Sequence, residues 1–240
     1  MLNDFVAIAA ALPALTSTYC RRIGGDGDAV AAAPLAVLGL GTELGVAGLM
    51  RDEAGRHIGV AGEGGHVTLA ATTNREAAVL AQFRQRFGHA SAERALLGPG
   101  LVNLTQAICP IDALPCTAMQ PADVAQRALA GGDAACTETL ELFGAFLGSV
   151  AGSRALTLVA RRHRAMSWGG RLRGAAVSSA LRRQGPLSRL PGTYSDRGIH
   201  RSGARPVRRG ERARCIDRVI ARGELAKPRC EHVLVTGASR

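Results

Sequence analysis

The sequence predicts an α/β protein in which strands come first along the chain and helices follow. A continuous apolar run over 34–40 is typical of a strand buried on both faces. A Gly-bearing turn and a second apolar segment over 46–51 follow it, as in a β-hairpin. Several later segments carry apolar residues at helical spacing. The 240 residues are 47% hydrophobic but only 3% aromatic, so we expect a core built mainly from Ala, Val and Leu.

The first predicted element is a helix that begins at Asn3 or Asp4, since either side chain can cap it. The hairpin follows, and 58–69 is expected to form strand and loop. The expected apolar face of the first helix contains Phe5, Ile8, Ala9 and Leu12.

The clearest helical pattern begins at Thr73 or Asn74 and ends at Gly88. Ser91 is expected to cap a short helix after it. Further helices are expected over 101–108, over 121–129 and from about 137 to 150. On the helix that ends at Gly88, the side chains predicted to be buried are Val79, Leu80, Phe83 and Phe87.

Charge divides the chain into two parts, 1–160 and 161–240. The first part holds 10 Arg, no Lys and 14 acidic residues, a net charge of −4. The second holds 19 Arg, one Lys and 5 acidic residues, a net charge of +15, and it lacks apolar periodicity. We therefore predict a folded domain over 1–160 and a disordered Arg-rich tail over 161–240.

An Arg-rich tail is also typical of nucleic-acid binding. Only Trp168 and Tyr194 are available there for stacking on bases, and no RNA-binding motif is present. Specific nucleic-acid partners are therefore not expected.

The six cysteines, at 20, 109, 116, 136, 215 and 230, form no CxxC pair and have no His at zinc-ligand spacing. We expect free thiols in a reducing cytosol.

The apolar segment 6–15 follows an acidic residue rather than basic ones, and no stretch reaches the roughly 20 apolar residues of a membrane span. The expected location is therefore cytoplasmic, with no membrane partner.

Four stretches carry polar residues suited to chemistry: Asn3-Asp4-Phe5, LGLGTELGVA at 38–47, GEGGHVTLA at 62–70, and GHASAERALLGPGLVNL at 88–104. Each alone has a structural interpretation, such as a helix cap, a Gly-rich turn or an acid in the first turn of a helix. Residue chemistry alone therefore indicates an α/β domain whose Gly-rich turn could hold phosphate.

Together, in this order and spacing, the four stretches resemble the bacterial glucokinase family over about 1–160. The EGGHV and SAER-x-L-x-GPGLVN blocks are the most specific. The resemblance implies an incomplete larger domain of the actin-like (ribonuclease H-like) ATPase and sugar-kinase fold. It also implies ATP-dependent phosphorylation of glucose to glucose 6-phosphate in glycolysis, with Mg²⁺, and a homodimer as a candidate assembly.

The same resemblance implies roles for individual residues. Asp4 matches the catalytic base, which accepts the proton of the 6-hydroxyl of the sugar as that hydroxyl attacks the γ-phosphorus. Carboxylate, amide and imidazole groups suit sugar hydroxyls, which both donate and accept hydrogen bonds. The residues that match the sugar-binding positions are Asn3, Glu63, His66 and Glu93. Gly41 and Thr42 match a turn whose backbone N–H groups hold nucleotide phosphate.

The chain departs from the family pattern in three ways. It contains no Asp-x-Gly-Gly-Thr-Asn turn ahead of the Asn-Asp pair. Glu43 stands where the family has Gly, which adds a Cβ and a negative charge facing a triphosphate. The Arg-rich tail, 161–240, does not match the family pattern. We therefore expect little or no kinase activity, and two alternatives remain open: a non-catalytic glucose-binding remnant and a non-functional fragment.

A frameshift accounts for the tail. Residues 176–199 read AVSSALRRQGPLSRLPGTYSDRGI. With permitted codons read one base later, the same stretch gives PFRARFDDKGRFRDYLAPIPIAAF, which resembles the C-terminal segment of the family. GC-rich codons read out of frame also produce Arg, Gly, Ala and Ser. We therefore expect the out-of-frame region to begin between 160 and 176.

Overall fold

The computed structural model describes residues 4–14, 21–22, 33–40, 43–158, 166–167 and 232–237. The helices and strands, in chain order, are α1 Asp4–Ala11, η1 Leu12–Ala14, β1 Arg21–Arg22, β2 Leu35–Leu40, β3 Leu44–Arg51, β4 His57–Gly62, η2 Gly64–His66, α2 Asn74–Phe87, α3 Ala92–Leu96, α4 Gly98–Ile111, α5 Pro121–Ala130, α6 Ala134–Thr157, β5 Met166–Ser167 and β6 His232–Gly237.

The strands form one sheet in the order β1-β5-β6-β2-β3-β4, and all of the described strand pairs are antiparallel. The predicted hairpin is confirmed, because β2 pairs with β3 from Leu35↔Leu49 to Leu40↔Leu44. At the other end of β3, the Asp52 carboxylate accepts hydrogen bonds from the backbone N–H groups of Ala54 and Arg56, which closes the turn to β4.

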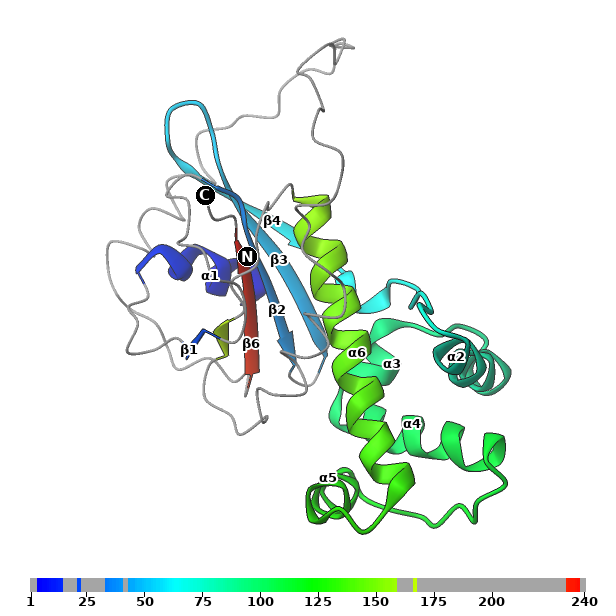
Figure 1. The fold of residues 1–240 in the computed structure, drawn as a ribbon. Helices are drawn as coiled ribbons and strands as arrows, with labels where there is room; N and C mark the ends of the chain where they lie inside the picture. Colours follow the sequence, from blue (N-terminus) through cyan, green and yellow to red (C-terminus); the bar gives the residue numbers. More distant parts are fainter. Residues whose placement is uncertain are drawn as a thin grey trace.

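Helices cover both faces of this sheet: α1 lies against one and α6 against the other (Figure 1). The strand residues divide between the two faces because successive side chains along a strand point to opposite faces of the sheet. Val37, Ala47 and Leu49 form a small cluster with α1. Leu38 and Val46 belong instead to the larger cluster that contains α6. The α/β class predicted from the sequence is therefore confirmed.

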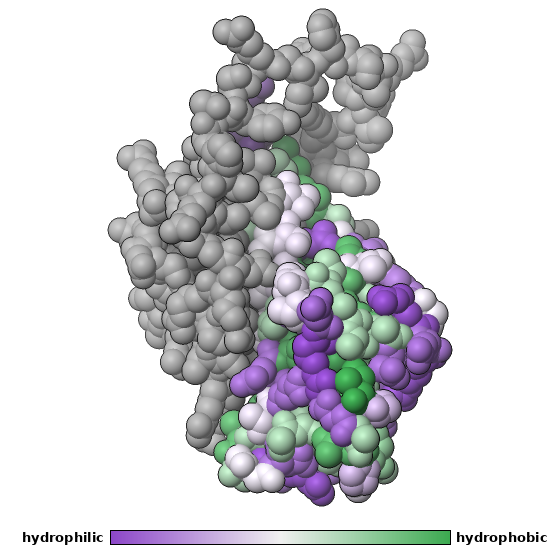
Figure 2. All heavy atoms as spheres, turned by 45° about the vertical axis from the view of Figure 1, so that its right-hand side comes forward, coloured by the Kyte–Doolittle hydropathy of each residue, from purple (hydrophilic) through white to green (hydrophobic). Residues whose placement is uncertain are grey.

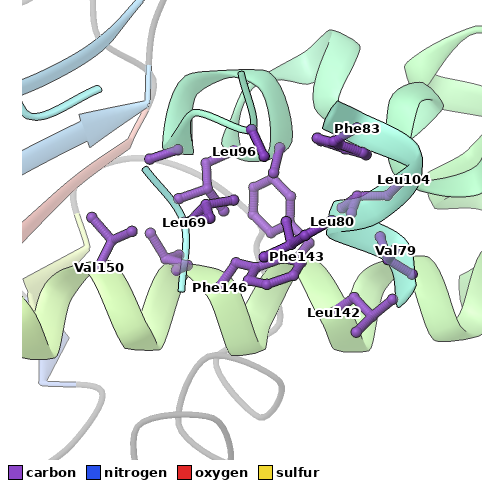
Figure 3. Close-up of a cluster of buried hydrophobic side chains, with 14 of the residues drawn as sticks. Leu69, Val79, Leu80, Phe83, Leu96, Leu104, Leu142, Phe143, Phe146 and Val150 are labelled. Carbon is purple, nitrogen blue, oxygen red and sulfur yellow. The ribbon is translucent and has the colours of Figure 1, made fainter. Parts of the chain in front are cut away.

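The larger cluster lies mainly where α2, α3 and α4 pack against α6 (Figure 1). Ala, Leu and Val make up most of the buried apolar residues, as predicted. The largest members of this cluster are aromatic, however: Phe143 and Phe146 project from α6 into it, and Phe83 lies on its α2 side (Figure 3). On the outside of these helices, hydrophilic residues are interspersed with hydrophobic ones (Figure 2).

Local signals define both ends of α2, as predicted. The Thr73 side chain accepts the backbone N–H of Glu76, and the Glu76 carboxylate accepts the backbone N–H of Thr73. These reciprocal bonds satisfy two amides that the first helical turn leaves free. Gly88 ends the helix with φ at +73°, a conformation that glycine adopts without strain.

Ser91 occupies the position expected of a helix cap, but its side chain makes no capping hydrogen bond to α3. It is buried and pairs with Thr68 in an isolated antiparallel β-bridge. The expectation of a side-chain cap was therefore wrong, because a contact with a distant segment fixes this residue.

Two segments within 161–240, where the sequence predicts disorder, are strands. β6 pairs with all six residues of β2, from Leu35↔Gly237 to Leu40↔His232, and β5 pairs with β6 and β1. The run HVLVTG is rich in β-branched and apolar residues, which favour strands, and β2 offers an edge that β3 leaves open. The prediction of disorder therefore fails for these eight residues, and the remainder of the tail lies outside the described residues.

Three cysteines lie in the described residues, and all are free thiols, as expected for them: Cys109, Cys116 and Cys136. Burial raises the pKa of the Cys109 thiol to about 12 and that of the Cys136 thiol to about 11. Both are therefore protonated and weakly nucleophilic near neutral pH.

None of the described helices has the length and apolar character needed to cross a membrane.

Arg75 connects three helices through its guanidinium group. Its Nε and Nη2 atoms donate to the Glu138 carboxylate of α6 at 2.7 and 2.8 Å. Nη1 and Nη2 donate to the Asp112 carboxylate at the end of α4 at 2.7 and 2.5 Å. The bonds to Glu138, and then those to Asp112, raise the pKa of Arg75, and the Arg75 hydrogen bond lowers the pKa of Asp112.

We expect this arrangement to make stability depend on pH in the acid range. The pKa of Asp112 is lower in the folded state than in the unfolded state, so its contribution is present above the unfolded value, about 3.9, and is lost as pH falls through the folded value. Urea denaturation of wild type and Asp112→Asn should therefore differ at about pH 6 and converge towards about pH 2. The control is Glu141→Gln. The carboxylate of Glu141 is exposed on α6 and has no ion-pair partner among the described residues. A difference that does not narrow as pH falls would contradict this expectation.

Candidate active site

The segment that carries Glu63 and His66 lies directly on the first residues of β3. Glu63 precedes η2, and His66 ends it. A Cβ on Gly65 would lie 2.6 Å from the backbone oxygen of Leu44, and a Cβ on Gly64 would overlap the Val46 side chain. The two glycines therefore let η2 approach the strand more closely than any other residue would allow.

Glu93 reaches the same place from the first turn of α3. Its Oε2 lies 3.8 Å from Nε2 of His66. The same oxygen would be only 3.1 Å from a Cβ on Gly65, so the carboxylate rests over this glycine. The side chain of His66 is 68% exposed and that of Glu93 is 25% exposed, so both groups remain accessible to a ligand. The structure thus brings together His66 and Glu93, two of the residues predicted to bind a sugar, and it places Glu63 at the start of the same short helix as His66.

A short antiparallel pairing fixes the segments that carry His66 and Glu93. The backbone N–H of Ala92 donates to the oxygen of Val67, and that of Leu69 donates to the oxygen of Ala90, both at 2.9 Å. Val67 follows His66 and Ala92 precedes Glu93, so the two candidate side chains flank the first of these hydrogen bonds.

Asp4 approaches from the opposite face of the sheet. It is exposed at the start of α1, and the next residue, Phe5, packs against Gly45 so closely that a Cβ there would overlap the ring. Gly45 follows Leu44, whose backbone oxygen contacts Gly65. The start of β3 therefore supports both Asp4 and the sugar-binding candidates. Within the described residues, no hydrogen bond or ion pair joins Asp4 to them, and such contacts often tighten only when substrate is bound.

The predicted phosphate turn lies at the same end of β3. Leu40↔Leu44 is the last pair of the β2–β3 ladder, so the turn is the connection that follows it. Glu43 is exposed in this connection. Asn3, Gly41 and Thr42, the other predicted site residues, lie outside the described residues.

The described candidate residues are mainly acidic: the carboxylates of Asp4, Glu43, Glu63 and Glu93 are carried by segments at the start of β3, and the one imidazole among them is that of His66. Acceptor oxygens suit the hydroxyl donors of a sugar. The same charges would repel a triphosphate unless a cation accompanied it.

The residues that support this site were not predicted from the sequence. Gly45 and Gly65 each permit a close contact that a side chain would block, and Thr68 and His89 form a hydrogen bond beside the paired segments. Glycine within a strand is a known signal of close approach, so Gly45 could have been noticed. Nothing local in the sequence indicates that Thr68 meets His89.

Solved structures show the same fold. A glucokinase from an Antarctic psychrotroph matches with a TM-score of 0.62 and 34% identity, over 66% of this chain and 48% of that one. The glucokinase of Balamuthia mandrillaris, solved in complex with glucose, matches with a TM-score of 0.58 and 19% identity, over 67% and 49% of the two chains. The described domain is therefore part of an actin-like sugar-kinase fold.

Comparison with sequence relatives identifies the family as well as the fold. The family model described as Glucokinase matches residues 1–163. The glucokinase of Aromatoleum aromaticum is 49% identical over 158 residues, which are 66% of this chain and 47% of the relative. That of Chromobacterium violaceum is 47% identical over 161 residues, which are 67% and 46%. The chain belongs to the glucokinase family, and it spans about half the length of these relatives.

Proposed function

We propose that this protein binds glucose and serves the transfer of the γ-phosphoryl group of ATP to the 6-hydroxyl, which gives glucose 6-phosphate. One observation above all supports the proposal: His66 and Glu93, distant in sequence, meet over Gly65 with Nε2 and Oε2 3.8 Å apart. A partly exposed carboxylate and an exposed imidazole held at this spacing suit neighbouring sugar hydroxyls. Such a site rejects analogues that lack a hydroxyl, because its own polar groups would lose their partners.

Asp4 is the proposed general base. Its carboxylate is exposed at the start of α1 and can accept the proton of the 6-hydroxyl as the oxygen attacks phosphorus. Asn3 is proposed to help bind the sugar, and Gly41 and Thr42 to hold phosphate through their N–H groups.

Mg²⁺ is proposed to arrive with the nucleotide. Among the described residues, no group of three or more His, Cys, Asp or Glu side chains is arranged to hold a metal ion. Mg²⁺ bound through nucleotide phosphates and water needs only one or two protein carboxylates, which the acidic site can supply. Bound there, it would neutralise phosphate charge. The proposed location is the cytoplasm, and a homodimer is the proposed assembly.

A second function, glucose binding without phosphoryl transfer, is favoured by Glu43. Its exposed carboxylate lies in the phosphate turn and would repel the nucleotide. We expect turnover of this chain to be very low for that reason.

The two functions separate when Glu43 is replaced. Glu43→Gly is expected to raise the rate of glucose 6-phosphate formation about tenfold, the factor that removal of about 1.4 kcal/mol of repulsion gives. Adding Asp4→Asn should then lower the rate at least about 100-fold. Isothermal titration with glucose, on wild type and Glu93→Gln, measures sugar binding separately.

These measurements distinguish the kinase, the glucose-binding remnant and the non-functional fragment. Turnover that depends on Asp4 supports the kinase. Glucose binding that requires Glu93, without turnover in the Glu43→Gly variant, supports the binding remnant. No binding of glucose by any variant would refute both and leave the non-functional fragment.

The composition of 161–240 is proposed to arise from translation in a shifted frame. Sequencing the coding DNA across codons 150–240 tests this. A single inserted or deleted base that restores the family pattern would support it, and an intact reading frame confirmed in independent isolates would contradict it.

A further inference from the structure

One side-chain hydrogen bond joins the two segments that carry His66 and Glu93. Oγ1 of Thr68 and Nε2 of His89 lie 2.8 Å apart. Thr68 lies two residues beyond His66, and His89 lies four residues before Glu93. Neither belongs to the proposed set of sugar-binding or catalytic residues.

The hydrogen bond is placed to fix the register of these segments. It lies next to the backbone bond from Leu69 to Ala90, and the bond from Ala92 to Val67 follows it towards the site. A slip of one residue in so short a pairing would change the separation of His66 and Glu93, because His66 lies directly before the paired residue Val67 and Glu93 directly after the paired residue Ala92.

The apolar contacts of these segments specify that register only weakly. Leu69, Ala90 and Ala92 are buried in the larger cluster and hold both segments against it. Two of these three are alanines, whose small side chains discriminate poorly between alternative registers. A hydrogen bond between a hydroxyl and an imidazole is directional and supplies the missing specificity.

The bond contributes little to global stability, since it lies at an exposed position where water can replace it. Its effect is therefore expected to be local. Either neutral form of the His89 ring permits the bond, because the Thr68 hydroxyl can donate or accept.

We propose that Thr68 and His89 are positioning residues that set the spacing of His66 and Glu93, and thereby the selectivity of the site for sugars that offer hydroxyls to both. This inference rests on the proposed binding of glucose. Neither residue is expected to touch the sugar.

The test uses Thr68→Val and His89→Ala, the double variant, and Thr68→Ser, which keeps the hydroxyl. Thr117→Val, an exposed threonine in the connection between α4 and α5, is the matched control. Glucose and its singly deoxygenated analogues are titrated by calorimetry. Amide hydrogen exchange at Leu69 and Ala92, and thermal unfolding, are measured on the same samples.

Thr68→Val and His89→Ala are each expected to weaken glucose binding about fivefold to tenfold, and the double variant no further. Discrimination between glucose and its deoxy analogues should decrease. Exchange at Leu69 and Ala92 should accelerate about tenfold, while amides in α6 keep their rates and the unfolding midpoint stays within about 2 °C of wild type. Thr68→Ser and Thr117→Val should resemble wild type in every measurement.

Unchanged exchange at Leu69 and Ala92 in Thr68→Val and His89→Ala would overturn the inference, whether or not glucose binds. So would equal losses of affinity for glucose and all deoxy analogues, together with a lower unfolding midpoint, because that pattern indicates general destabilisation. If wild type binds no glucose, the proposed function fails. Accelerated local exchange would then still support the role of the pair in fixing the register.

Discussion

Replacing Gly45 with alanine is expected to destabilise the protein by about 1–3 kcal/mol and to displace Asp4. A Cβ at this position would overlap the ring of Phe5, and β3 is held on both sides by β2 and β4. The ring must therefore move rather than the strand. Phe5 follows Asp4 on α1, so its movement shifts the proposed catalytic base.

The expected loss of phosphoryl transfer is about 100-fold, because a shift of about 1 Å in a reacting group has effects of that size. The Glu43→Gly background, in which turnover is expected to be higher, is suited to this measurement. Urea denaturation gives the change in stability.

Gly48→Ala is the matched control on the same strand. There the nearest atom to a new Cβ is the end of the Leu158 side chain at 3.3 Å, which can adjust. Phe5→Leu combined with Gly45→Ala should recover part of the stability, since the smaller side chain leaves room for the methyl group. Equal stability and turnover in Gly45→Ala and Gly48→Ala would show that Phe5 does not position Asp4.

Phe146→Ala is expected to cost about 3–5 kcal/mol of unfolding free energy, the largest effect of any single substitution considered. The side chain is 0% exposed in the middle of α6, among residues of α2, α3 and α4 (Figure 3). Removing the ring leaves a cavity among elements that cannot all collapse into it. A loss of this size is a large share of the roughly 5–15 kcal/mol that stabilises a typical domain.

Phe87→Ala is the control for this substitution. Phe87 is only partly buried, and its ring packs edge-on against Phe83 and beneath the guanidinium of Arg94 at the surface. Its replacement should cost clearly less than that of Phe146. Urea denaturation of both variants, with a comparison of the denaturant slopes, measures the difference. A smaller loss for Phe146 than for Phe87 would contradict the assignment of the core centre.

The elements predicted most accurately are those whose signals lie within a few residues. Thr73 and Gly88 define α2 through a capping box and a glycine with positive φ, and both could be recognised from local sequence. The apolar run of β2 and the hairpin to β3 were likewise visible. Periodicity also gave the approximate position of α6, although its start at Ala134 lies earlier than predicted.

The order and spacing of four motifs in the sequence determined the family, and with it the identities of the candidate site residues. The pairing of β6 with β2 was not predictable, because composition describes the average of a segment and not whether six of its residues fit a free strand edge. The same applies to Ser91, whose local pattern indicates a cap while its actual partner, Thr68, lies in another segment.

The sequence by itself thus determined the fold class, the ends of α2 and the residues that form the candidate site. Only the tertiary structure decided that His66 meets Glu93 over Gly65, that Phe5 rests on Gly45 and that Thr68 bonds His89. The physical reason is the range of the interactions. Caps and periodicity act between neighbours along the chain, whereas these contacts depend on the packing of η2, α1 and α3 around the start of β3.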